Sequence, residues 1–140
     1  KCTGSKCVIV DPEKHDNITA AISHVPHIIA ATLVNLIREN DTPDGFMKAF
    51  AAGGFKDITR IASSSPEMWE NICLSNKDSI DHFLELYIKS LETFLKLLRE
   101  ENNESLRNTF LDAGTYRDSI PDNISDKLTN NFTDKKTGAE

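Results

Sequence analysis

The residues best suited to chemistry lie in one segment of the chain, residues 53–69, with the sequence GGFKDITRIASSSPEMW. Its only arginine, Arg60, carries a planar guanidinium whose paired donors match a carboxylate in bidentate fashion. Asp57 lies three residues earlier and Lys56 four. Asp57 could therefore form a salt bridge with Arg60, orient it toward a ligand, or do both. The segment predicts an anion-binding site, with a purely structural ion pair as the alternative.

The two ends of this segment carry residues that interrupt regular structure. Gly53 and Gly54 permit a positive φ angle or a close approach of two backbones. Ser65 followed by Pro66 is typical of a helix N-cap and the first residue of a helix. Trp69, the only tryptophan, is more often a core residue than the wall of a ligand site, and both interpretations stay open.

Two histidines, His24 and His27, lie three residues apart and therefore on one face of a predicted helix. Pro26 between them has no N–H to donate, so we expect a kink in the helix at this point. A kinked helix could direct an imidazole into a cleft, where it donates to an anion. The alternative is a structural histidine bonded to a backbone carbonyl. The spacing lacks the glutamate of known zinc-binding helices, so we predict no metal site.

The composition is that of one soluble domain: 140 residues, 39% hydrophobic and 27% charged. A net charge of -6 without a Lys/Arg cluster argues against a nucleic-acid partner. No apolar run approaches the roughly 20 residues of a membrane span, so no membrane partner is expected. Three cysteines, an odd number without a regular framework, favour reduced thiols and a cytoplasmic location.

The pattern of apolar residues predicts an all-α domain over residues 11–120. The short apolar run Cys7–Val10 resembles a buried strand, and its missing partners predict a sheet that lies before this chain. Residues 121–140 are polar and predict a weakly ordered tail. The predicted helices cover residues 12–40 with a break at Pro26, 44–52, 66–74, a long helix capped by Asn76 that reaches Leu98, and 104–117.

The long helix is apolar over most of its circumference between Ile80 and Leu98. A helix of this kind must be covered on several sides. A symmetric dimer would cover it, and so would a central position within a monomer, so both interpretations stay open.

Several of these motifs together resemble the C-terminal domain of prephenate dehydrogenases. They are His15-Asp16, ISHVPHIIA at 22–30, GGFKDITRIA at 53–62, SPEMW at 65–69 and YRDSIP at 116–121, in a resemblance that runs from about Val8 to Pro121. It implies a helical bundle of the 6-phosphogluconate dehydrogenase C-terminal-like type that forms an intertwined homodimer. It also implies NAD-dependent oxidative decarboxylation of prephenate to 4-hydroxyphenylpyruvate, a step of tyrosine biosynthesis.

In such enzymes an N-terminal Rossmann domain carries NAD and the catalytic histidine, so we expect no catalytic or cofactor-binding residue in this chain. Residues 1–10 would then be the end of that domain. The substrate-binding residues that the resemblance implies are Arg60, His27, Gly53, Asp57, Trp69, His24 and Lys56. Arg60 would bind a carboxylate of prephenate, and His27 would hydrogen-bond the substrate. The alternative is a stand-alone, non-catalytic helical module for dimerisation or ligand binding.

Overall fold

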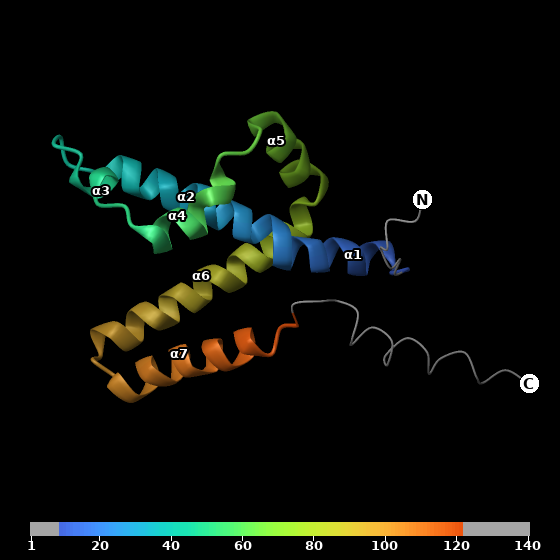
Figure 1. Ribbon diagram of the computed structural model, residues 1–140. Helices are drawn as coiled ribbons and strands as arrows, with labels where there is room; N and C mark the ends of the chain where they lie inside the picture. The colour runs from blue at the N-terminus through green and yellow to red at the C-terminus, as the bar shows by residue number, and fades with distance from the viewer. Residues whose placement is uncertain (1–8, 122–140) are drawn as a thin grey trace, which may run out of the picture. The chain divides into compact units, whose positions relative to one another are not determined.

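The computed structural model describes residues 9–121, and every regular element in this range is a helix (Figure 1). The prediction of an all-α chain is confirmed for this part. Of the predicted strand at Cys7–Val10, only Ile9 and Val10 are described, and neither lies in a strand; the rest of it, and the predicted tail at 121–140 apart from Pro121, lie outside the described residues. The elements are α1 (Pro12–Thr19), the π-helical turn η1 (Ala20–His24), α2 (Val25–Asn40), α3 (Phe46–Ala49), α4 (Gly53–Thr59), the 3-10 turn η2 (Arg60–Ala62), α5 (Pro66–Ser75), α6 (Lys77–Arg99) and α7 (Asn103–Asp118).

The described chain forms two compact units, Val10–Ser90 and residues 91–121. The first unit contains every helix from α1 to α5 and the first part of α6. The second contains the end of α6 and all of α7.

In the first unit, α1, η1 and α2 form one continuous helix, Pro12–Asn40. The carboxylate of Asp11 accepts the N–H groups of Glu13 and Lys14 at 3.0 and 3.4 Å, and this cap begins the helix where the sequence predicts. The break expected at Pro26 takes the form of the π-helical turn just before it. There the N–H of Val25 bonds to the carbonyl of Ala20, five residues back. Such π-helical turns occur often at functional sites.

This helix is long and apolar enough to cross a membrane, judged by its length and composition. The finding corrects the expectation that no apolar run approaches the length of a membrane span. The core helix of a soluble protein passes the same test, and this helix supplies the buried residues Ala20, Val25 and Ala30.

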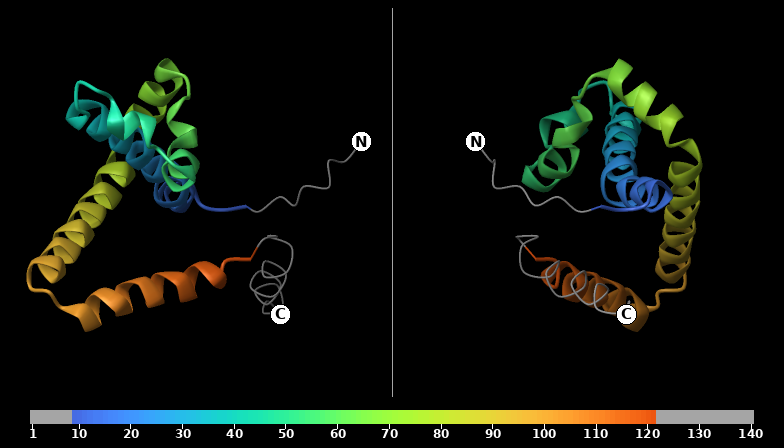
Figure 2. Two further views of the ribbon diagram at one scale, coloured as in Figure 1. Left: turned by 60° about the vertical axis from the view of Figure 1, so that its left-hand side comes forward. Right: turned by 90° about the vertical axis from the view of Figure 1, so that its right-hand side faces the viewer.

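The core of this unit is small and surrounds the π-helical turn. Ala20, Val25 and Ile80 are buried against one another, so the first turns of α6 pack on η1 and the start of α2. The partly buried residues around them are Ile28, Ile29, Phe83 and Leu84. On its other side α2 packs against α4 and η2, as Figure 2 shows in its right-hand view. The helix that carries both histidines is therefore held from two sides.

The predicted bounds of the helix at 44–52 are wrong. α3 is a single turn that begins at Phe46, after Gly45 adopts a φ of 70°. The carboxylate of Asp41 accepts the N–H groups of Met47 and Lys48 at 2.9 and 3.1 Å. This left-handed glycine breaks the helical path, so the helix begins two residues later than predicted, and it ends at Ala49.

Asp41→Ala is expected to lower the free energy of unfolding by about 1 kcal/mol, since the first turn of α3 loses its carboxylate cap. Urea denaturation at one fixed protein concentration measures the change. Glu39→Ala serves as the control, because the Glu39 side chain makes a single, exposed ion pair within residues 9–121, with Arg38. Equal stability of the Asp41 and Glu39 variants would contradict the capping role.

The glycine pair has a simpler role than the sequence predicts. Gly53 and Gly54 form the first turn of α4, and neither has a positive φ. A Cβ built on either would meet no heavy atom within 4 Å. The prediction of a positive φ or a close backbone approach at these two residues is therefore wrong.

The second unit, residues 91–121, is a pair of helices without a buried side chain. The rings of Phe94 and Phe110 meet edge to face, with centroids 5.9 Å apart. Leu91, Leu95 and Leu98 are 50%, 42% and 55% exposed. Only the first turns of α6, near Ile80, are therefore covered within the monomer. The apolar side chains of its later turns are exposed in the monomer, so a second chain would be needed to cover them.

Candidate functional site

Three aromatic side chains from different elements meet in the first unit: His24 of η1, His27 of α2 and Trp69 of α5. The rings of His27 and Trp69 are stacked, with centroids 3.6 Å apart and an interplanar angle of 18°. His24 meets the same indole at its edge, at 6.1 Å and 84°. The long helix that carries both histidines therefore contacts α5 through Trp69. This contact is compatible with Trp69 as a core residue and with Trp69 as the wall of a ligand site.

Local hydrogen bonds fix the start of α5 and with it the place of Trp69. The Ser65 hydroxyl oxygen accepts the N–H of Met68 at 3.3 Å, and Pro66 follows the cap, as predicted. The same hydroxyl donates to the Glu67 carboxylate at 2.9 Å. The backbone N–H of Glu67 and then this hydroxyl stabilise the charged form, so the pKa of Glu67 lies below its ordinary value.

The stacked pair His27–Trp69 lines a cavity of about 460 Å³ between α2 and α5. Most of its lining is apolar or small, with Thr32 and Asn35 of α2 and Glu70 of α5 as polar groups. The remaining lining residues are Ile28, Ala31, Ala62, Ser64, Ser65, Pro66 and Cys73. An apolar cavity with few polar groups is the usual form of a small-molecule site.

The other predicted residues lie on α4 and η2, outside this lining. Arg60, Lys56 and Asp57 are exposed, and no hydrogen bond or ion pair joins their side chains to any other described residue. The alternative of a salt bridge between Asp57 and Arg60 is thus absent from the described part of the chain. The structure brings together the side chains of His24, His27 and Trp69. Arg60 does not line the cavity, but it comes two residues before Ala62, which does.

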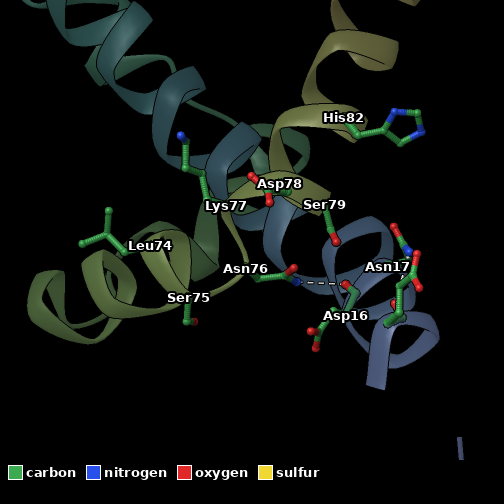
Figure 3. Close-up of a pocket in the computed structure, with 10 residues that line it drawn as sticks. Asp16, Asn17, Leu74, Ser75, Asn76, Lys77, Asp78, Ser79 and His82 are labelled. Atoms are coloured by element: carbon green, nitrogen blue, oxygen red, sulfur yellow. Dashed lines mark hydrogen bonds between the residues drawn. The ribbon is translucent and has the colours of Figure 1, made fainter. Parts of the chain in front are cut away.

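A second cavity, of about 710 Å³, lies where α1 meets the junction of α5 and α6 (Figure 3). Its lining includes Glu13, Asp16 and Asp78, yet no group of three or more metal-binding side chains occurs in the part of the chain described. Asn76 also lines it, with its amide bonded to the carbonyl of Asp16. The sequence predicts Asn76 only as the cap of the long helix. No local signal indicates this contact, because the partner lies 60 residues away.

Burial lowers the pKa of His27 from its ordinary value of 6.5. The folded protein therefore favours the neutral imidazole, and this group contributes stability above pH 6.5 that is lost as the pH falls through the folded pKa. An NMR titration of the His27 ring proton should give a pKa below 6.5, with the resonance assigned by its absence in His27→Asn. A value at or above 6.5 would show that burial does not govern this ring.

Comparisons with known proteins identify the family. The family described as "Prephenate dehydrogenase, dimerization domain" matches residues 11–112. The chain is 44% identical over 121 residues to a protein named prephenate dehydrogenase from Bacillus subtilis, covering 86% of this chain and 33% of that protein. It is 31% identical to the protein of the same name from Lactococcus lactis, covering 83% and 33%. The chain thus spans about a third of the length of the relatives that it matches.

Solved structures agree with this match. A prephenate dehydrogenase from A. aeolicus, crystallised with hydroxyphenyl propionate and NAD+, has a TM-score of 0.75 and 36% identity, and the match covers 80% of this chain and 39% of that one. A Synechocystis arogenate dehydrogenase has a TM-score of 0.77 at 24% identity, covering 82% and 42%, which shows the fold alone. The chain belongs to the family of prephenate dehydrogenase dimerization domains.

Proposed function

We propose that this chain is the dimerisation and substrate-binding part of an NAD-dependent prephenate dehydrogenase. The family match over residues 11–112 carries the proposal, because it includes α4, η2 and the cluster of His24, His27 and Trp69. The structure with hydroxyphenyl propionate and NAD+ is a relative at 36% identity, which supports an aromatic acid as the kind of ligand.

The substrate that we propose, prephenate, has two carboxylates and a ring hydroxyl. The reaction removes a hydride from the ring carbon that bears the hydroxyl and releases the ring carboxylate as CO2. The hydroxyl proton leaves as the hydride is transferred and a proton returns to that oxygen as the ring becomes aromatic, which gives 4-hydroxyphenylpyruvate with no net loss of a proton. A dianion needs a local cation in a chain of net charge -6. Arg60 supplies it, with a guanidinium that no described residue neutralises. His27 hydrogen-bonds the substrate, and the indole of Trp69 forms an apolar wall.

The remaining predicted residues keep supporting roles in this proposal. Asp57 and Lys56 lie on α4 with Gly53 at its first turn, on the exposed surface that leads to Arg60. Asp57 orients the guanidinium once a substrate is bound, and Gly53 and Lys56 shape the approach. His24 contributes through its contact with Trp69.

NAD is the hydride acceptor of the proposed reaction, but the described residues do not fit a dinucleotide. A nucleotide-binding unit needs a strand, a glycine-rich turn and a helix in succession. The described residues contain no strand, and the glycine pair at Gly53 opens α4 without the required spacing. We therefore assign NAD to the rest of the whole protein, with residues 1–10 leading from it and 11–120 forming the domain described here.

A homodimer is the partner that best covers the apolar surface. Residues 91–121 have no buried side chain, and a helix pair without a core is not stable alone. The exposed apolar side chains of α6 are Leu86, Tyr87, Ile88, Leu91, Leu95 and Leu98. A two-fold dimer covers such a surface with its own copy. An enzyme of this kind works in the cytoplasm without a nucleic-acid or membrane partner, with the helix Pro12–Asn40 as a core helix of the dimer.

Turnover separates this proposal from a stand-alone module. The full-length protein is assayed for 4-hydroxyphenylpyruvate with prephenate and NAD, and with arogenate as the competing substrate, while calorimetry measures prephenate binding to this chain alone. We expect turnover of prephenate by the full-length protein and none by the chain alone. A full-length protein that dimerises but turns over neither substrate would favour the non-catalytic module.

A further inference from the structure

The side chain of Asn76 links the junction of α5 and α6 to two consecutive elements much earlier in the chain, α1 and η1. It lies between the end of α5 and the start of α6 and is partly buried. Its Nδ2 is 2.8 Å from the carbonyl oxygen of Asp16, at the last turn of α1, as the dashed line in Figure 3 shows. The same nitrogen is 3.3 Å from Nδ1 of His24, in η1. The two partners precede Asn76 by 60 and 52 residues.

The carbonyl of Asp16 determines which way this amide points. A backbone carbonyl can only accept a hydrogen bond, so the NH2 group of Asn76 must face it. A flipped amide would place two acceptor oxygens against each other. The NH2 group has two hydrogens, one for the carbonyl and one for the ring of His24.

The orientation of the amide in turn determines the tautomer of His24. Because Asn76 donates to Nδ1, that nitrogen must be the acceptor of a neutral imidazole, and the ring proton is on Nε2. Nε2 makes no hydrogen bond to any described residue, so its N–H remains available as a donor. The ring meets Trp69, which is stacked on His27 at the cavity between α2 and α5.

We propose that Asn76 is a positioning residue that holds His24 as the Nε2–H tautomer, so that the cluster with Trp69 and His27 offers a fixed hydrogen-bond donor to the substrate. This role in binding rests on the proposed function, whereas the tautomer itself depends only on the contacts of Asn76. A fixed donor needs no rearrangement when a carboxylate or carbonyl oxygen arrives.

The tautomer is measured directly by long-range ¹H–¹⁵N NMR of the full chain with ¹⁵N-labelled histidine. We expect wild-type His24 to show a protonated Nε2 and an unprotonated Nδ1. Asn76→Asp replaces the donor by an acceptor, so the ring proton should move to Nδ1. Asn71→Asp on α5 is the matched control, since the Asn71 amide donates to the carbonyl of Glu67 and to no other residue that the structure describes, and it should leave the tautomer unchanged.

Wild-type His24 with its proton on Nδ1 would overturn the proposal, even if the Asn76 variant failed to fold. An Nε2–H tautomer that survives in folded Asn76→Asp would also overturn it. In the full-length enzyme, Asn76→Asp should raise the KM for prephenate roughly tenfold, as for one lost hydrogen bond, with a smaller change in kcat. A correct tautomer without turnover in the wild type would count against the proposed function and leave the role of Asn76 intact.

Discussion

Arg60→Ala is expected to raise the KM for prephenate strongly, with a loss in kcat/KM equivalent to roughly 2–5 kcal/mol. The guanidinium of Arg60 is exposed on η2, and no described carboxylate neutralises it. Its charge is thus free to pair with a substrate carboxylate, and truncation leaves that carboxylate without its partner. Steady-state kinetics of the full-length protein with varied prephenate measures the loss.

Two further variants make this test specific. Arg60→Lys keeps the charge but loses the planar pair of donors, so it should recover only part of kcat/KM. Arg38→Ala is the matched control, because Arg38 is an exposed arginine on α2 whose only side-chain partner among the described residues is Glu39, at 3.3 Å. An Arg60→Ala enzyme with the kinetics of the Arg38 control would remove Arg60 from the substrate site.

Helix starts were predictable wherever a local pattern determines them. Asp11 and Ser65 each precede a proline, and both accept N–H groups from the first turn that follows. These interactions involve residues two or three apart, so the sequence contains all the information they need. The starts of α1 and α5 agree with the sequence for this reason.

Interactions between distant residues were not predictable in the same way. The carboxylate of Asp41 reaches Met47 and Lys48 across a turn, which moves the start of α3. The π-helical turn shifts the hydrogen bond of Val25 by one residue, and residue types alone do not specify that shift. Asn76 looks like an ordinary cap until its contact with Asp16 is seen.

The site was predictable in its parts and not in its assembly. Residue spacing indicates His24 and His27 as a pair on one helix face, and Arg60 as an anion ligand. Nothing in the spacing indicates that Trp69 stacks on His27, because that contact depends on how α5 returns to α2. The family resemblance supplied the grouping of these residues as a substrate site, and the structure shows only that His24, His27 and Trp69 lie together, while their part in binding stays a proposal. The role of Arg60 in binding the substrate also remains a proposal, which the kinetics of the Arg60 variants test.

The second large effect concerns the dimer. Size-exclusion chromatography with light scattering should show a dimer of the wild-type protein, and Leu91→Asp should dissociate it. Leu91 is 50% exposed on α6, in a unit without a buried side chain. In a two-fold dimer the substitution is present on both subunits. Each copy removes buried apolar surface and places a charge in the interface. The dissociation free energy should fall by roughly 2–4 kcal/mol, so Kd rises about 30- to 1000-fold.

Lys96→Glu is the control for this variant, because it reverses a charge at an exposed position of the same part of α6. Lys96 lies about 140° around the helix from Leu91 and at least about 100° from Leu95 and Leu98, so it is off the apolar line. The control should remain a dimer if the apolar line is what the second copy covers. A monomeric wild type would refute the dimer itself. A Leu91→Asp protein as dimeric as the Lys96 control would show that the interface does not include this face of α6, and the exposed Phe110 and Leu111 of α7 would be the next residues to test.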